Sequence, residues 1–180
     1  MKLIKLVENV FELPTFLSDG ECESLIEFAE SIGFKTADVQ TTSGREFHTH
    51  IRNNERADYQ SSSLAETYWQ RLLGLELPTY ENKNAIGLSP NFRFYKYLPG
   101  QKFNMHKDGR QSIGDNQTFF TFLVYLNEDC VGGETLFRSG NLMVAPKKAS
   151  ALIFEHQLWH QGVAVVSGSK YVLRSDIVYG

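Results

Sequence analysis

The sequence predicts an α+β fold, in which N-terminal helices cover a double-stranded β-helix, or jelly roll. Two segments in the first half of the 180-residue chain carry helix-capping signals followed by apolar residues at helical spacing. From Asn91 onward, short runs rich in Phe, Tyr, Val and Leu alternate with turn residues. This order predicts one domain, residues 1–180, with a helical cover over about 1–90 and a jelly-roll core over about 91–180.

The two helices are predicted from their start signals. Ser18 and Glu21 form a capping box, and apolar residues then recur on one face over several turns. Ser63, with Glu66 three residues later, predicts the start of a second amphipathic helix in LAETYWQRLLGL. The segment 36–59 between them is polar and shows only weak strand alternation, so we expect a surface segment near a functional site.

The C-terminal half is predicted to consist of strands. Its apolar runs are FRFYKYL, TFFTFLVYL, ETLF, NLMVA, SALIFE, GVAVV and KYVLRSDIVY. Gly, Pro, Ser and Asn separate these runs at short intervals, which is typical of an antiparallel sandwich or barrel.

Composition limits the classes of function and location. A net charge of −3, with 22% charged and 42% hydrophobic residues, indicates a soluble globular enzyme and does not favour nucleic acid as a partner. Cys22 and Cys130 are too few for a disulfide scaffold or a thiolate zinc site, so we expect a reducing, cytoplasmic location. We identify no export signal and no run near the roughly 20 apolar residues of a membrane span. The sequence does not define an oligomeric state.

Three residues predict a metal site. His106 and Asp108 form an H-x-D element, and residues two apart in an extended chain point the same way. His160 follows about fifty residues later, after SALIFE, where a later strand of a jelly roll returns to the same end of the barrel. Two histidines and one carboxylate on one side of a metal, with open positions opposite, are typical of non-haem Fe(II) oxygenases.

The last predicted strand carries two cations. A 2-oxo acid bound at the open metal positions needs a cation for its distant carboxylate, and Lys170 and Arg174 are both candidates. The alternative for Lys170 is an exposed lysine of an edge strand, which prevents unwanted strand pairing.

Several segments together resemble one known family. These are YKYLPGQKFNMHKD, TFLVYLNE, GGETLF, SALIFEHQLWH and GSKYVLRSDIVY, which span about residues 91–179 in the family's order. They resemble the catalytic domain of iron(II)- and 2-oxoglutarate-dependent oxygenases of the prolyl 4-hydroxylase-like group. The resemblance implies that His106, Asp108 and His160 are the iron ligands.

The resemblance also implies a binding site for 2-oxoglutarate. Lys170 matches the family's basic anchor, with Arg174 as the second candidate. Tyr97 matches the tyrosine that donates to the same carboxylate, and Tyr95 is the competing choice. Further residues are expected to line this pocket: Leu123, Tyr125 and Thr135.

The implied enzyme is a dioxygenase that uses Fe(II), 2-oxoglutarate and O2, with ascorbate as a candidate reductant. It would hydroxylate a C–H bond of a prolyl-type peptide or a small molecule and release succinate and CO2. One alternative is a nucleic-acid demethylase of the same superfamily, which should have a basic surface. The other is a non-catalytic, cupin-like module that binds a metal or ligand, which would not need a cation ten residues after the last metal ligand.

The remaining polar residues divide into two groups. We predict that Arg52 and Arg56 lie on a substrate-binding lid over the iron, with a solvated charge cluster as the alternative. The H-x-H of His48 and His50 has no third ligand nearby and is interpreted as surface histidines, with a role at the substrate entrance as the alternative. His156 lacks a partner at ligand spacing, so we expect a core histidine.

Overall fold

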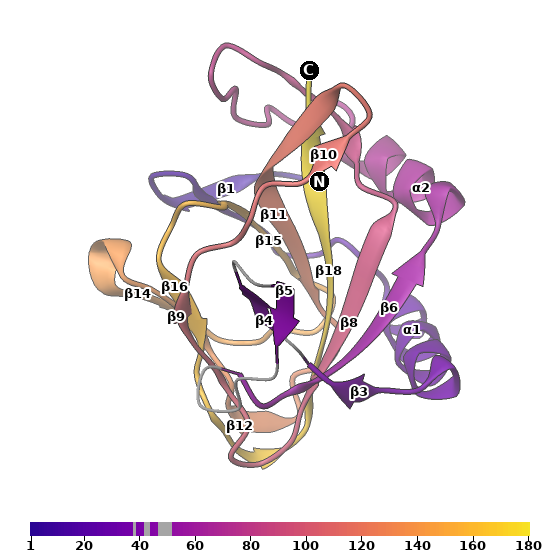
Figure 1. The fold of residues 1–180 in the computed structure, drawn as a ribbon, viewed down its shortest axis with the longest axis vertical. Coiled ribbons are helices and arrows are strands. Elements are labelled where there is room, and N and C mark those ends of the chain that lie inside the picture. The colour runs from indigo at the N-terminus through magenta and orange to yellow at the C-terminus, as the bar shows by residue number, and fades with distance from the viewer. Residues whose placement is uncertain (38, 42–43, 47–51) are drawn as a thin grey trace.

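The chain folds into antiparallel sheets flanked by helices (Figure 1). The computed structural model describes residues 1–37, 39–41, 44–46 and 52–180. The helices are α1 (Asp19–Ile32), α2 (Ser62–Leu72) and the short 3-10 helix η1 (Ser139–Asn141). The strands are β1 (Ile4–Val7), β2 (Val10–Leu13), β3 (Lys35–Thr36), β4 (Val39–Thr41), β5 (Gly44–Glu46), β6 (Glu55–Gln60), β7 (Ala85–Leu88), β8 (Asn91–Tyr97), β9 (Phe103–His106), β10 (Ser112–Ile113), β11 (Asn116–Tyr125), β12 (Cys130–Gly132), β13 (Thr135–Phe137), β14 (Leu142–Val144), β15 (Ala151–Glu155), β16 (His160–Gly162), β17 (Val165–Gly168) and β18 (Lys170–Tyr179).

Two sheets enclose the interior in which the candidate site lies. The large sheet has the strand order β1-β2-β15-β11-β18-β8-β6-β3, with β10 beside β11 and β7 beside β18. The smaller sheet has the order β14-β13-β16-β9. Buried aromatic rings join the two, since Phe137 of β13 packs on Phe154 of β15 with ring centroids 5.0 Å apart. The predicted sheet-rich fold is confirmed.

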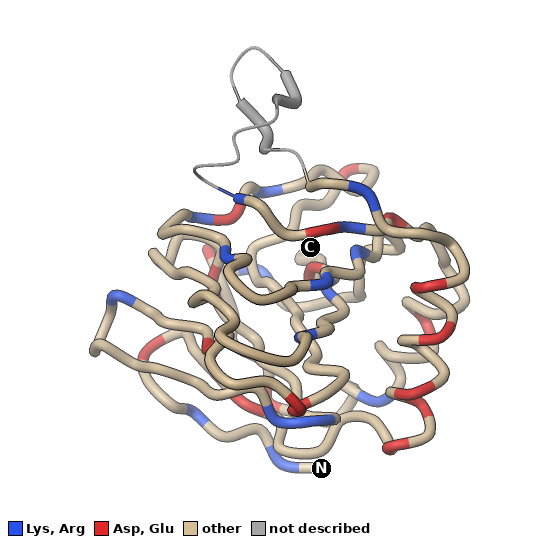
Figure 2. Tube along the Cα trace, turned by 90° about the horizontal axis from the view of Figure 1, so that it is seen from below, with Lys and Arg blue, Asp and Glu red and all other residues tan. Residues whose placement is uncertain are grey.

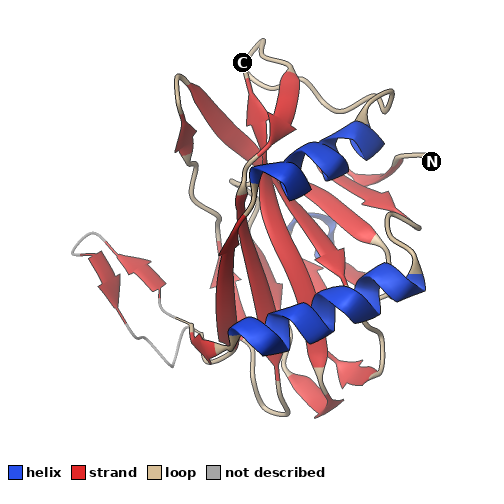
Figure 3. Cartoon of the chain, turned by 90° about the vertical axis from the view of Figure 1, so that its right-hand side faces the viewer, coloured by secondary structure: helices blue, strands red, loops and turns tan. Residues whose placement is uncertain are grey.

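Both α-helices lie across the other face of the large sheet (Figure 3). The ring of Phe28 in α1 lies 6.1 Å from that of Phe94 in β8. Tyr68 in α2 packs on Phe16, with ring centroids 5.3 Å apart. These rings belong to an apolar core between the helices and the sheet. Within the described ranges, no helix has the length and hydropathy needed to cross a membrane.

The start of α1 agrees with its sequence signal, whereas that of α2 does not. The Ser18 hydroxyl accepts from the backbone N–H of Glu21, and the Glu21 carboxylate accepts from that of Ser18, which confirms the capping box. For α2, the N-cap is Ser61, whose hydroxyl accepts from the N–H of Leu64 at 3.2 Å. The predicted cap at Ser63 was therefore wrong, because the helix begins two residues earlier.

The N-terminal half contributes strands as well as helices. β1 and β2 lie at one edge of the large sheet, and β6 and β3 lie at the other. β6 comes from the segment expected at the surface and pairs with β8 over its whole length. On the face opposite Ala57 and Tyr59 it carries Arg56 and Asp58 in place of apolar residues, and the Asp58 side chain is 57% exposed. This substitution explains why the strand alternation in the sequence was weak.

Candidate metal and cosubstrate site

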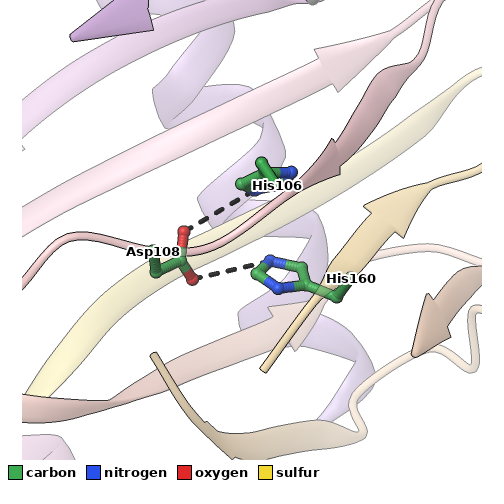
Figure 4. A group of neighbouring side chains, drawn as sticks. All are labelled: His106, Asp108 and His160. Atoms are coloured by element: carbon green, nitrogen blue, oxygen red, sulfur yellow. Dashed lines mark ion pairs between the residues drawn. The ribbon is translucent and has the colours of Figure 1, made fainter. Parts of the chain in front are cut away.

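The predicted metal ligands lie together in the interior (Figure 4). His106 ends β9 and His160 begins β16, and these two residues are opposite each other in the pairing of the strands. Nε2 of His106 lies 3.6 Å from Oδ1 of Asp108, and Nε2 of His160 lies 3.6 Å from Oδ2. All three ligand atoms are within 4.8 Å of one another. The structure thus brings the predicted triad to one point.

Backbone carbonyls set the orientation of both imidazole rings. Nδ1 of His106 lies 2.7 Å from the carbonyl oxygen of Asn104, and Nδ1 of His160 lies 2.9 Å from that of Leu158. A carbonyl oxygen only accepts, so each Nδ1 carries the proton and each Nε2 presents a lone pair. Burial lowers the pKa of His160 to about 4, which keeps this ring neutral. Two imidazoles that present Nε2 beside a carboxylate are a donor set that suits Fe(II).

Two side chains hold the Asp108 carboxylate in place. The Thr121 hydroxyl donates to Oδ2 at 2.6 Å, and Nη1 of Arg174 donates to Oδ1 at 2.7 Å. Burial alone would raise the pKa of the Asp108 carboxyl, but Arg174, His160 and His106 together outweigh burial and hold this pKa well below its usual range. Sequence analysis missed Thr121, although it stands two residues before Leu123 and therefore on the same face of β11.

The two candidate cations of β18 have different surroundings. Arg174 pairs with Asp108 and also donates to Asp176, at 3.1 Å. Lys170 is 3% exposed, donates to the carbonyl oxygen of Gly133 at 2.6 Å, and pairs with no carboxylate of the described residues. A Cβ on Gly133 would lie 3.1 Å from Cδ of Lys170, so glycine permits this close approach. The charge of Lys170 is thus available to a bound carboxylate.

The residues expected to bind 2-oxoglutarate gather around Lys170. Tyr97 is opposite Lys170 in the β8–β18 pairing, and its ring centroid lies 5.1 Å from Nζ. The Tyr125 hydroxyl lies 2.7 Å from Oγ1 of Thr135, and its ring centroid is 5.4 Å from Nζ. Burial raises the pKa of Tyr97 to about 12, so its phenol remains a donor. One pocket is lined by the triad together with Tyr95, Tyr97, Leu123, Thr135, Lys170 and Arg174.

The structure separates the two predicted substrate residues. Arg52 is 5% exposed, and its guanidinium carbon lies 4.4 Å from the ring centroids of both Tyr95 and Phe103, which line the pocket. Arg56 lies on β6 and forms an ion pair of 3.0 Å with Asp58. Arg52 therefore contacts the wall of the candidate site, whereas Arg56 is engaged at the neighbouring sheet edge.

Of the remaining histidines, the structure describes His156, which does not join the triad. His156 is fully buried, and its Nε2 lies 3.1 Å from Oδ1 of Asp176. Its carbonyl oxygen accepts from the N–H of Asp108, so it is a core histidine behind the metal ligand, as expected. His48 and His50 lie outside the described residues.

The antiparallel sheets and the triad define a class of protein, namely enzymes with a non-haem metal site of two histidines and one carboxylate. The model of the 2OG-Fe(II) oxygenase superfamily matches residues 92–175. The chain is similar to this superfamily and, within it, to prolyl 4-hydroxylases. The members use Fe(II), 2-oxoglutarate and O2, which confirms the predicted enzyme class and cofactors.

Individual relatives are distant in sequence. The chain is 25% identical over 202 residues to prolyl 4-hydroxylase 13 of Arabidopsis thaliana, covering 91% of this chain and 69% of that protein. A prolyl-4-hydroxylase of Pseudomonas putida has the same fold, with a TM-score of 0.72 at 16% identity, over 94% of this chain and 92% of that one. A prolyl hydroxylase of Trichoplax adhaerens was solved with a peptide fragment of the hypoxia inducible factor oxygen degradation domain. It has a TM-score of 0.70 at 16% identity, over 94% of this chain and 83% of that one.

Proposed function

We propose that this dioxygenase holds Fe(II) with His106, Asp108 and His160 and hydroxylates a C–H bond of a prolyl-type peptide. The observation that carries the proposal is the meeting of three donor atoms within 4.8 Å beside a buried lysine that has no carboxylate partner among the described residues. Iron(II) bound there supplies O2 activation, which couples decarboxylation of 2-oxoglutarate to succinate and CO2 with hydroxylation of the substrate.

The protein's own part begins with the binding of 2-oxoglutarate. Lys170 pairs with the distant carboxylate, for which its present partner is only the Gly133 carbonyl. Tyr97, next to Lys170 and protonated, donates to the same carboxylate. We assign Arg174 to the orientation of Asp108, since both of its Nη groups already donate to carboxylates. Leu123 and Thr135 complete the wall of the pocket, whereas Tyr125 does not line it and contacts it through the Thr135 hydroxyl.

A peptide substrate is supported by the relatives, which are named as prolyl hydroxylases, and by the peptide bound in the Trichoplax structure. A small molecule is the alternative substrate. A metal-binding module without turnover is disfavoured, because a buried ammonium without a counter-charge costs folding free energy that metal binding alone does not require. The net charge of −3 does not favour a nucleic-acid substrate.

The proposal extends to the architecture and the location. We interpret the two facing sheets as a jelly roll, α1 and α2 as its outer cover, and residues 1–180 as one domain. Both cysteines are free, which agrees with the proposed reducing, cytoplasmic location.

The test is a screen for succinate formed from 2-oxoglutarate by the purified protein with Fe(II). Proline-containing peptides, free amino acids and small metabolites serve as substrates. We expect iron-dependent succinate formation that a peptide stimulates. If neither iron nor any substrate changes the rate of succinate formation, the proposed function is wrong.

A further inference from the structure

Arg52 is a buried cation without an acidic partner among the described residues. Its Nε donates to Oδ1 of Asn54 at 2.7 Å, whereas its Nη2 is buried and has no hydrogen-bond partner. Its other close neighbours are the ring faces of Tyr95 and Phe103. A buried charged donor left without an acceptor is costly, and a bound ligand that supplies an acceptor offsets this cost.

The neighbouring cations show that this arrangement is not a general property of the interior. Each of the other arginines on the same inner side of the sheet has an acidic partner: Arg56 with Asp58, Arg93 with Asp176, and Arg174 with both Asp108 and Asp176. Under the proposed function, Lys170 receives the carboxylate of 2-oxoglutarate. Arg52 then retains one positive charge that neither the described residues nor the cosubstrate balance.

Arg52 is connected to the candidate metal site through the ring of Phe103. Phe103, on which the guanidinium lies, stacks on the ring of His106 with centroids 3.5 Å apart and an interplanar angle of 14°. Lys170 instead contacts the rings of Tyr97 and Tyr125, so the two cations share no ring. The two cations are therefore separate: Lys170 lines the pocket, whereas Arg52 lies against two rings of the pocket wall and is not needed for 2-oxoglutarate.

The charges near the site agree with an anionic ligand. Trp159, which precedes the ligand His160, is 42% exposed, and its ring centroid lies 5.4 Å from Nζ of Lys107 and 5.2 Å from Cζ of Arg138. Acidic residues gather instead along α1 (Figure 2), which lies on the opposite face of the large sheet. An acidic substrate is thus attracted to the site and not to the helical face.

We propose that Arg52 is a specificity-determining residue that binds a carboxylate of the substrate, so that the preferred substrates are acidic peptides. The inference rests on the proposed function and adds the substrate class to it. A guanidinium suits this role because its fork of N–H donors matches the two oxygens of a carboxylate. The carboxylate belongs to a Glu or Asp side chain near the hydroxylated residue, or to the C-terminus of the peptide.

The test is isothermal titration of the protein, loaded with Mn(II) and 2-oxoglutarate, with matched proline peptides. One set carries Glu or Gln next to the proline, and a second carries a free or an amidated C-terminus, which separates the two sources of the carboxylate. We expect the parent to bind the acidic member at least about tenfold more tightly, as befits a hydrogen-bonded charge. Arg52→Gln should reduce this preference to about twofold or less, and Arg52→Lys should keep part of it.

Arg56→Gln is the matched control, because Arg56 is also an arginine near the site but is paired with Asp58. It should retain the preference of the parent. Thermal unfolding and Mn(II) affinity report whether Arg52→Gln is folded. If it is not, Arg52→Lys decides, since a carboxylate bound by the fork should lose affinity with lysine while the Gln peptide does not.

The outcomes distinguish this inference from the proposed function. Iron-dependent succinate formation and Mn(II) binding by the parent are measured first, and their absence contradicts the proposed function itself. If they are present, equal affinity for acidic and amide peptides, no binding of any peptide, or an equal loss in Arg56→Gln overturns the role of Arg52 alone.

Discussion

The two faces of the large sheet are both buried, yet they differ in chemistry. Along β18, Leu173 and Ile177 pack under the helices, whereas Lys170, Arg174 and Asp176 point into the interior. Burying charged groups costs free energy, and the interior face has them only where they meet partners or a ligand. A strand that is buried on both sides, but polar on one, therefore marks the face that carries the function.

The largest effect is expected from the triad on the interior face. Replacing His106, Asp108 or His160 with Ala should abolish turnover, because each change removes one of only three protein ligands. Asp108→Glu should fail as well, since the longer side chain moves its oxygen away from the position set by Thr121 and Arg174. Succinate formation and Fe(II) binding are the measurements. Full activity of any one variant contradicts the assignment.

A substitution on the face under the helices should lower the stability of the fold and leave metal binding unchanged. Phe94 is fully buried between β8 and α1, next in sequence to Tyr95 on the interior face. Phe94→Ala should lower the free energy of unfolding by about 3–5 kcal/mol, measured in urea. At temperatures where the variant is folded, its Mn(II) affinity should match the parent's. A large loss of metal affinity in the folded variant would show that the two faces are not independent.

The two cations of β18 lie on the same interior face but should affect different ligands. Lys170→Ala should raise the Kd for 2-oxoglutarate by about a hundredfold with little change in Mn(II) affinity, because a buried carboxylate loses its counter-charge. Arg174→Ala should instead weaken Mn(II) binding by about 10–100-fold, since Asp108 loses a donor. Titration of both variants with both ligands separates the roles. If Arg174→Ala alone impairs 2-oxoglutarate binding, the anchor is misassigned although the function stands.

The sequence was sufficient to group the three triad residues, but not to decide which of the two cations, Lys170 or Arg174, is the 2-oxoglutarate anchor. Residues two apart in an extended chain share a face, and this rule grouped His106, at the end of β9, with Asp108 just after it. Lys170 and Arg174 also share a face, so the same rule leaves both as candidates. The hydrogen-bond partners of the two cations distinguish their roles. Asp176, two residues after Arg174, was the signal that could have shown that Arg174 is already paired with a carboxylate.

The parts of the fold that escaped prediction are short or atypical strands. β1 and β2 have four residues each, and charged residues are interspersed among their apolar positions. β6 carries Arg56 and Asp58 on one face, so it lacks the apolar alternation by which half-buried strands are recognised. The burial of Arg52 follows from tertiary contacts with Tyr95 and Phe103, which local sequence patterns do not contain.

The smallest effect concerns the pH dependence of the cosubstrate subsite. Burial lowers the pKa of Lys170 to about 8, from an ordinary value of 10.5. Below pH 8 the ammonium is present and pairs with the carboxylate of 2-oxoglutarate. Above pH 8 the free protein must take up a proton to bind, so the Kd for 2-oxoglutarate should rise by up to about tenfold per pH unit.

As the pH rises, the lowered pKa of Lys170 makes 2-oxoglutarate binding weaker but makes the fold more stable. Between pH 8 and 10.5 the unfolded chain holds the lysine proton and the folded chain does not, so the contribution of Lys170 to the free energy of unfolding rises with pH. Titration of the Mn(II)-loaded protein with 2-oxoglutarate from about pH 7 to about pH 9 checks the binding slope. Lys170→Arg is the control, because its guanidinium stays charged throughout and its slope should be flatter. Equal slopes in the parent and Lys170→Arg would show that another group governs the titration and that Lys170 is not the anchor.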